Sequence, residues 1–202
     1  MPRKRLTREE SRDQTRERLL ESGATIIAKK GLTGSSVEDI AAHAGYTRGA
    51  FYSNFGSKTD LFIELLKRDH HDIQQGLQAI LDAGLPKKDM QAQLSAFYLQ
   101  AYCGDTSFAL WAEARLCALR DPKFRTRLNA LLLEKRDTIG YFIEQFCKVM
   151  EKTLPVPGQD LAFGTMALID GVRFFNACMP KELPEENAQA MLAAIFSATF
   201  FD

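Results

Sequence analysis

The stretch SSVEDIAAHAGYTRGAFYSNF, residues 35–55, gathers side chains that can read a nucleic acid. An arginine can donate two hydrogen bonds to guanine, and an asparagine can pair with adenine. Hydroxyl groups can hold phosphates or base edges. In the second half of this stretch the side chains of these kinds are Thr47, Arg48, Tyr52, Ser53 and Asn54. The chemistry that they predict is the recognition of DNA.

Two short helices with a tight turn between them would position these side chains. Ser35 and Glu38 match a capping box, in which the serine oxygen accepts a free backbone N–H and the glutamate reaches back. A helix is therefore predicted to begin at this serine. Gly45 can supply the left-handed residue that ends it, and Thr47 can cap the next helix.

The second of these helices has one apolar edge and one polar face. Phe51 and Phe55 lie four residues apart and would anchor it to the helices before it. The opposite face, with Arg48 and Tyr52, would protrude as a recognition helix does in a major groove. Gly49 costs about 1 kcal/mol relative to Ala in a helix, which is reasonable if the backbone must approach DNA closely. An ordinary solvent-exposed helix pair is the alternative that the spacing alone leaves open.

Helical spacing continues on both sides of this pair. Apolar residues predict a first helix over about residues 8–30. Ser57 and Asp60 predict the cap of a fourth helix that runs towards Ile80. Lys58 lies in the first turn of that helix, where the lysine and the free N–H groups could together bind a phosphate.

Charge and composition limit the class of protein. The chain has 202 residues, 46% hydrophobic and 26% charged, and no net charge. Residues 1–58 nevertheless carry eleven Lys and Arg against seven Asp and Glu, so the first quarter is suited to a polyanion. The N-terminal run is not a signal peptide, and no apolar run reaches 18 residues. We expect a cytoplasmic protein without membrane contact, whose four cysteines are buried, reduced thiols.

The segment VEDIAAHAGYTRGAFYSNFGSKTDLF resembles the DNA-binding signature of the tetracycline-repressor (TetR) family of transcriptional regulators. The family pattern is matched at Gly45, Thr47, Gly49, Phe51, Tyr52, Phe55, Ser57, Lys58 and Leu61. With the preceding KKGLTGSSVEDIA, the close match covers about residues 12–66. Beyond that only length and helix pattern agree. Tyr46 stands where the family usually has a smaller aliphatic residue.

The resemblance implies an all-α protein in two parts. Residues 1–56 would form an N-terminal three-helix helix-turn-helix DNA-binding domain, and residues 57–202 a C-terminal helical domain for effector binding and dimerisation. The function implied is a ligand-responsive regulator, more commonly a repressor, which binds a palindromic operator in double-stranded DNA as a homodimer. A small, largely apolar effector would release it. The predicted DNA contacts are Ser36, Thr47, Arg48, Gly49, Ala50, Tyr52, Ser53, Asn54 and Lys58.

The last two predicted helices support the homodimer. DLAFGTMALIDGVRFFNACM, residues 160–179, is apolar around most of its circumference, and EENAQAMLAAIFSATFF, residues 185–201, ends in apolar residues. Two such helices from each chain could form a four-helix bundle. The alternative is that both helices are internal to a monomer. The predicted interface residues are Phe163, Met166, Ile169, Phe175, Met191 and Ile195.

The region of about residues 89–151 is where the family binds its effector. Large flat side chains there and nearby could line an apolar pocket. The candidates are Phe97, Tyr98, Tyr102, Phe108, Trp111, Phe142, Phe146 and Phe174. Aromatic residues at helical spacing also form ordinary core, so this alternative stays open. Glu113 and Arg115 are candidate polar groups, although a surface or interhelical role is open to them as well.

Two other classes of protein remain as alternatives. The sequence holds no motif of a hydrolase, a metalloprotease, a phosphate loop or a dinucleotide site, so we expect neither an enzyme nor a cofactor or metal. A helical protein whose first domain contacts another protein is the second alternative. It predicts binding without the steep salt dependence that phosphate contacts produce.

Overall fold

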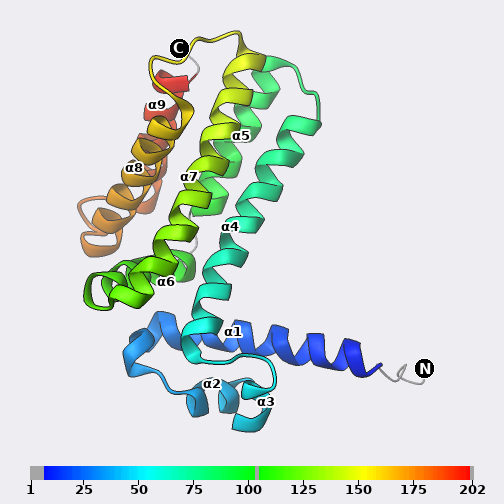
Figure 1. The fold of residues 1–202 in the computed structure, drawn as a ribbon. Helices are drawn as coiled ribbons and strands as arrows, with labels where there is room; N and C mark the ends of the chain where they lie inside the picture. The colour runs from blue at the N-terminus through cyan, green and yellow to red at the C-terminus, as the bar shows by residue number, and fades with distance from the viewer. Residues whose placement is uncertain (1–6, 103–104, 201–202) are drawn as a thin grey trace. The chain divides into compact units, whose positions relative to one another are not determined.

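The computed structural model describes residues 7–102 and 105–200, and within them every regular element is helical. This confirms the predicted all-α class. Figure 1 shows the helices in chain order. They are α1 (Arg8–Gly34), α2 (Val37–His43), α3 (Arg48–Tyr52), α4 (Lys58–Asp82), α5 (Lys87–Tyr102), α6 (Asp105–Arg120), α7 (Pro122–Met150), α8 (Gly158–Cys178) and α9 (Glu185–Phe200).

The chain packs into two compact units. The N-terminal unit consists of Met1–Asp69 with Ala109–Leu128, and the C-terminal unit of His70–Phe108 with Asn129–Asp202. The division therefore falls inside three helices, α4, α6 and α7. Each unit has its own buried side chains, and each is described by itself below.

The long α1 begins with a capping box and is broken near its end. Thr7 accepts a hydrogen bond from the Glu10 N–H and donates its own N–H to the Glu10 carboxylate. The helix does not end before Gly31, as its sequence predicts, but resumes and continues to Gly34. At the break Gly31 has φ 73° and ψ 167°, a conformation that is essentially restricted to glycine.

A carboxylate from a distant helix stabilises this break. The Leu32 N–H donates to Oε1 of Glu113 on α6 at 2.7 Å. A Cβ at Gly31 would lie 3.1 Å from the same oxygen, so the absence of a side chain there lets the carboxylate approach. Glu113 thus has an interhelical role within the N-terminal unit, one of the roles that its sequence leaves open.

The core of the N-terminal unit lies among α1, α2, α3, the start of α4, most of α6 and the start of α7. Phe62 of α4 stacks on Phe124 of α7 with ring centroids 5.7 Å apart. Arg127 of α7 forms an ion pair with Asp60 of α4 at 2.9 Å. The fully buried side chains of this unit include Leu19, Ile27, Ile40, Phe51, Leu61, Phe62 and Leu66.

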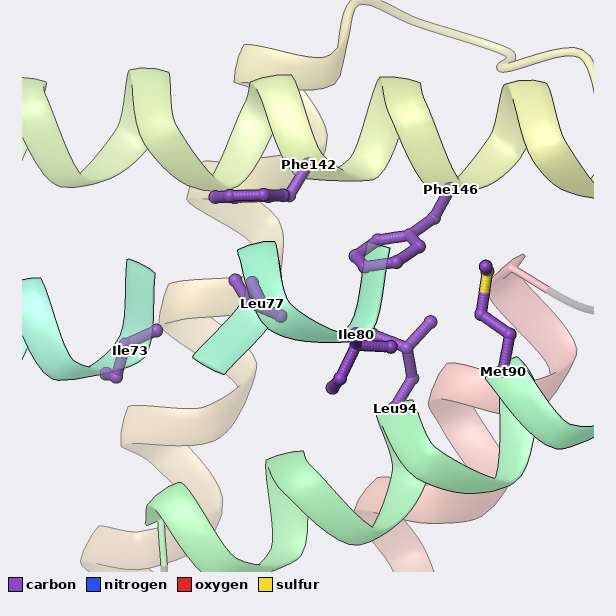
Figure 2. Close-up of a cluster of buried hydrophobic side chains, with 7 residues drawn as sticks. All are labelled: Ile73, Leu77, Ile80, Met90, Leu94, Phe142 and Phe146. Atoms are coloured by element: carbon purple, nitrogen blue, oxygen red, sulfur yellow. The ribbon is translucent and has the colours of Figure 1, made fainter. Parts of the chain in front are cut away.

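Among the described residues, three apolar clusters lie in the C-terminal unit. Figure 2 shows the first, in which α4, α5 and α7 contribute Ile73, Leu77, Ile80, Met90, Leu94, Phe142 and Phe146. The second joins α8 to α9 through Ile169, Val172, Ala188, Leu192 and Phe196. The third joins α7 to α8 through Ile139, Ile143, Cys147 and Ala162. Apolar contacts of this kind carry most of the stability of packed helices.

Helix α8 starts in close contact with α7. A Cβ at Gly158 would lie 2.5 Å from the Gly140 carbonyl oxygen, so both positions need a residue without a side chain. The Glu144 carboxylate accepts a hydrogen bond from the Gly158 N–H at 3.3 Å and caps this end of the helix. The glycine pair therefore sets where α8 begins its path along α7.

Three further observations concern the described residues. No helix among them is long and apolar enough to cross a membrane. Within the same ranges, His, Cys, Asp and Glu form no group of three or more that could hold a metal ion. Cys117 is half-buried and Cys147 is buried, but Cys178 is exposed, so the expectation of buried thiols is wrong for Cys178. Cys103 lies outside the described residues.

Candidate nucleic-acid interface

Helix α2 begins one residue later than its sequence predicts. Its N-cap is Ser36, whose hydroxyl accepts from the Asp39 N–H at 2.9 Å, while the Asp39 carboxylate accepts from the Ser36 N–H at 3.1 Å. The predicted pair of Ser35 and Glu38 is wrong because Ser35 is buried at the end of α1 and donates to the Leu32 carbonyl. The extra turn of α1 after Gly31 shifts the cap and leaves Glu38 out of the capping box.

The turn and helix α3 agree with the prediction from their sequence. Gly45 has φ 77° and follows α2, and the Thr47 hydroxyl accepts from the Ala50 N–H at 3.3 Å. Phe51 is fully buried and Phe55 is 4% exposed, with their rings 5.7 Å apart. The two phenylalanines anchor α3, and this burial confirms the predicted apolar edge.

The opposite face of α3 is open to solvent. Thr47, Arg48, Gly49, Tyr52 and Ser53 are exposed. A Cβ at Gly49 would meet only the Thr47 hydroxyl, at 3.7 Å, so nothing in the folded chain requires a glycine there. The structure thus brings these five predicted contacts together on one accessible surface, which we call the α3 face.

Arg48 is held by two neighbours on this face. Its Nη1 lies 2.7 Å from the Glu38 carboxylate of α2, and its guanidinium carbon lies 5.5 Å from the centre of the Tyr52 ring. The Tyr52 hydroxyl, followed by the Glu38 carboxylate, raises the pKa of Arg48. The arginine therefore keeps its charge and has a defined position at the start of α3.

The other predicted contacts are less accessible. Ser36 and Ala50 are half-buried. The Ser53 hydroxyl donates to the Gly49 carbonyl, and the Asn54 amide donates to the Ala50 carbonyl, both at 2.9 Å. The Asn54 side-chain oxygen is buried without a hydrogen-bond partner. In the free chain the Asn54 amide is thus directed at its own helix.

Lys58 links the end of α1 to the start of α4. Its half-buried ammonium group donates to the Ser35 carbonyl, and burial lowers the pKa of Lys58. To bind a phosphate, as predicted, this ammonium group would have to leave the carbonyl or share its remaining donors. The fourth helix itself begins as predicted, since Ser57 accepts from the Asp60 N–H at 3.1 Å.

A basic hollow borders Ser53 that no specific prediction anticipated. Arg8, Glu9 and Arg12 of α1 line it together with Ser53, and its volume is about 620 Å³. Arg16, one turn further along α1, donates to the Asn54 carbonyl at 3.0 Å and pairs with Glu64. The excess of positive charge in residues 1–58 was the available signal, but only the fold places these arginines beside the end of α3.

The predicted effector residues lie in different units and differ in burial. Phe142 and Phe146 are buried in the first apolar cluster, and the half-buried Phe97 packs against it. Trp111 is buried in the N-terminal unit, where its Nε1 donates to Asp69 at 2.7 Å. Phe174 is exposed, and the half-buried Phe108 lies 5.1 Å from the Arg173 guanidinium. The side chains of Tyr98 and Tyr102 lie outside the described residues.

The predicted dimer residues lie on α8 and α9, and they differ in burial. Phe163, Phe175, Met191 and Ile195 are exposed. Ile169 is 3% exposed and belongs to the cluster between α8 and α9, while Met166 packs against the cluster between α7 and α8. Phe174 of α8 and Met179, which directly follows the helix, were not in the predicted interface and add to this exposed apolar surface.

Comparison with known proteins finds relatives of the segment that contains α2 and α3. The family described as bacterial regulatory proteins, tetR family, matches residues 19–65, which contain α2, α3 and the turn between them. The HTH-type transcriptional repressor DhaR of Mycobacterium sp. (strain GP1) is 34% identical over 77 residues, or 38% of this chain and 39% of that protein. The chain thus spans about two fifths of the curated relatives that it matches first.

Solved structures resemble nearly the whole chain. A TetR-family transcriptional regulator from Rhodococcus sp. superimposes with a TM-score of 0.77 and 22% identity, covering 93% of this chain and 99% of that one. A transcriptional regulator from Saccharomonospora viridis, in complex with choline, gives 0.71 and 21% identity, covering 92% and 96%. At these identities the likeness establishes the fold. The named relatives are regulators of transcription, in agreement with the prediction that the chain is not an enzyme.

Proposed function

This chain belongs to the TetR family of bacterial regulatory proteins, and from that premise we propose that it is a DNA-binding transcriptional repressor. The observation that carries the proposal is the α3 face. Its five exposed residues stand on a short helix that buried Phe51 and Phe55 hold in place, inside the segment matched by the family. A helix anchored on one edge and open on the other is suited to enter a major groove.

In this proposal the exposed residues divide into two roles. Arg48 reads a base edge, because a guanidinium can donate two parallel hydrogen bonds to guanine. Thr47, Tyr52 and Ser53 contact phosphates or sugars and fix the register. Arg8 and Arg12 add phosphate contacts beside Ser53, since they line the hollow there. Residues 1–56 act as the DNA-binding domain and residues 57–202 as the effector-binding and dimerisation domain.

We test DNA binding with a random pool of short duplexes, selected for bound molecules at several salt concentrations. The expected result is an inverted repeat with half-sites about one helical turn apart. Affinity should fall by about 10³-fold or more between 50 and 200 mM salt if six or more phosphates are contacted. No enrichment, or binding that salt leaves unchanged, would move the function to a protein partner.

Single substitutions then test the α3 face. Arg48→Ala and Tyr52→Ala should each weaken operator binding and leave thermal unfolding almost unchanged, because both side chains are exposed. The comparison variant is Leu119→Ala, an exposed apolar residue of α6 in the same unit. If both face variants bound like Leu119→Ala, the recognition surface would lie elsewhere.

The dimer is part of the same proposal. Phe163, Phe174 and Phe175 of α8 and the following Met179 are exposed, as are Met191 and Ile195 of α9. A second copy would cover these side chains in a four-helix arrangement of α8 and α9. Sedimentation of the wild type and of Phe163→Ala with Phe175→Ala measures this directly. A wild-type monomer at micromolar concentration would contradict the arrangement.

We also propose an effector that is small and largely apolar. The support is the family membership and the first apolar cluster, against which Phe97 packs. The Phe97 ring also lies close to Gly76, where a Cβ would be 2.1 Å from the ring. An effector that prefers the form unable to bind DNA would shift the population towards it and release the operator. The test is titration of apolar compounds into the operator complex. A compound that binds the protein without changing operator affinity would be no effector.

A further inference from the structure

We infer that Glu38 is a specificity-determining residue of the DNA interface, because it positions Arg48 and disfavours operators that do not satisfy this arginine. The inference rests on the proposed function, in which the α3 face reads DNA. Glu38 itself belongs to α2, outside the predicted set of DNA contacts.

The geometry places the Arg48 guanidinium between two side chains. The Glu38 carboxylate lies 2.7 Å from Nη1, and the Tyr52 ring lies beneath the guanidinium at 5.5 Å. A guanidinium has five N–H donors in a rigid fork, so one carboxylate contact leaves other donors for a base edge. The arginine therefore approaches DNA with its orientation already restricted, which lowers the entropy that it loses on binding guanine.

Glu38 is available for this role because of the capping shift in α2. Asp39 fills the capping position, and hydrogen bonds from Ser36 and Lys30 lower the pKa of its carboxyl group. Lys30 also forms an ion pair with Asp39 at 3.2 Å. The carboxylate in the first turn of α2 that turns towards α3 is thus Glu38.

Charge explains how the pair could discriminate between DNA sequences. Glu38 and Arg48 are 57% and 64% exposed, and such pairs contribute little stability, so DNA can compete for the arginine. Guanine can accept two hydrogen bonds from the fork while Nη1 stays beside the carboxylate. A base that cannot accept them leaves Arg48 poorly bound and Glu38 close to the negative DNA backbone. Such a repulsive element separates correct from incorrect partners.

The experiment compares four proteins: the wild type, Glu38→Gln, Arg48→Ala and the double variant. Duplex selection with Arg48→Ala identifies the base pair whose preference is lost. Affinities are then measured for the operator and for the operator changed at that base pair. Glu38→Gln should raise affinity for the changed duplex about three- to tenfold. Affinity for the operator should change by about twofold or less, because the lost positioning of Arg48 offsets the removed negative charge. The ratio of the two affinities therefore falls.

The double variant separates positioning from a general charge effect. If Glu38 acts through Arg48, Glu38→Gln should leave the ratio unchanged when Arg48 is already alanine, as a double-mutant cycle requires for a coupled pair. Glu134→Gln removes the same charge from an exposed position of α7 and is the control for net charge. It should leave the ratio at the wild-type value. Thermal unfolding checks the fold, and Glu38→Ala is the second variant at the same position.

Two results would overturn the inference. An unchanged ratio in Glu38→Gln would show that the carboxylate does not set specificity. An equal fall of the ratio with and without Arg48 would show that Glu38 acts on DNA directly. A wild type that selects no duplex at all would refute the proposed function, and this inference with it, so the two failures are distinguishable.

Discussion

The two units of this chain differ in the contacts that stabilise each of them internally. In the N-terminal unit single polar groups fix the backbone at defined atoms, as Glu113 does at Leu32 and Lys58 at Ser35. In the C-terminal unit three apolar clusters hold the helices through many similar side chains. Hydrogen bonds are directional, whereas apolar burial is not. The N-terminal unit therefore adds directional contacts at single backbone atoms to its apolar core.

This difference predicts where single substitutions have large effects. A polar or steric change at one such contact of the N-terminal unit should lower stability or operator affinity measurably. A comparable change in the C-terminal unit should have a smaller effect, because many similar contacts remain. Four substitutions or modifications test the contrast, beginning with the largest expected effect.

Phe51→Ala should abolish DNA binding and destabilise the N-terminal unit by about 3–5 kcal/mol, because the ring is fully buried and leaves a cavity. Denaturant unfolding monitored by circular dichroism measures the loss. The control is Phe163→Ala, whose side chain is 47% exposed, and which should leave the unfolding of this unit unchanged. Equal losses in the two variants would show that burial of the Phe51 ring does not stabilise this unit.

Gly31→Ala should cost about 1–3 kcal/mol, because alanine is strained at φ 73° and ψ 167°. The new Cβ would also lie 3.1 Å from the Glu113 carboxylate and push it from the Leu32 N–H. Gly84→Ala is the matched control in the C-terminal unit, since Gly84 has φ 58° and nothing within 4 Å of a Cβ. Thermal unfolding of both variants should show the larger loss in Gly31→Ala, which combines the strain at φ 73° and ψ 167° with the displacement of Glu113.

Gly49→Ala should leave the fold intact or stabilise it by up to about 1 kcal/mol, since alanine is the better helix former and the position is open. Operator affinity should nevertheless fall, because the methyl group separates the α3 backbone from DNA. Fluorescence anisotropy with a labelled operator measures this fall. Gly34→Ala, whose Cβ would meet Lys30 at an ordinary 3.7 Å, is the control. A stable Gly49→Ala that binds normally would contradict the close approach.

The smallest expected effect is a difference between the alkylation rates of the individual cysteine thiols. Burial and the Glu113 side chain raise the pKa of Cys117 to about 11, and burial raises the pKa of Cys147. Because the thiolate is the reacting form, both should react slowly at pH 8 and faster as the pH rises. Among the three described thiols the exposed Cys178 should react first, as followed by mass spectrometry of its peptide. Faster reaction of Cys117 would mean that its contact with Glu113 opens in solution.

Local signals in the sequence predicted the turn before α3 and helix α3 itself well. The buried Phe51 and Phe55, the cap at Thr47 and the left-handed Gly45 are all found as predicted. Each depends on neighbours within a few residues, where residue type and spacing suffice. The single-residue error at the α2 cap has a long-range cause. Gly31 and the distant Glu113 let α1 continue for one more turn, and spacing within α2 cannot reveal this.

The positions of the predicted effector-pocket aromatic residues could not be predicted from local signals. Their helical spacing indicates that they are buried somewhere, but it does not say against what. Phe142 and Phe146 enter the first apolar cluster, Trp111 turns to Asp69 in the N-terminal unit, and Phe174 remains exposed. Which of these positions a side chain takes depends on which helices pack together, and that is a property of the whole fold.

The sequence by itself determined the helical class, the turn and caps around α3, and the residues of the α3 face, because these follow from local backbone preferences and the period of a helix. Only the tertiary structure decided that Asp39 caps α2 and that Glu38 therefore meets Arg48. It also decided that Arg8 and Arg12 lie beside Ser53. The physical reason is that contacts between residues far apart in the chain depend on packing between helices, which no local pattern encodes.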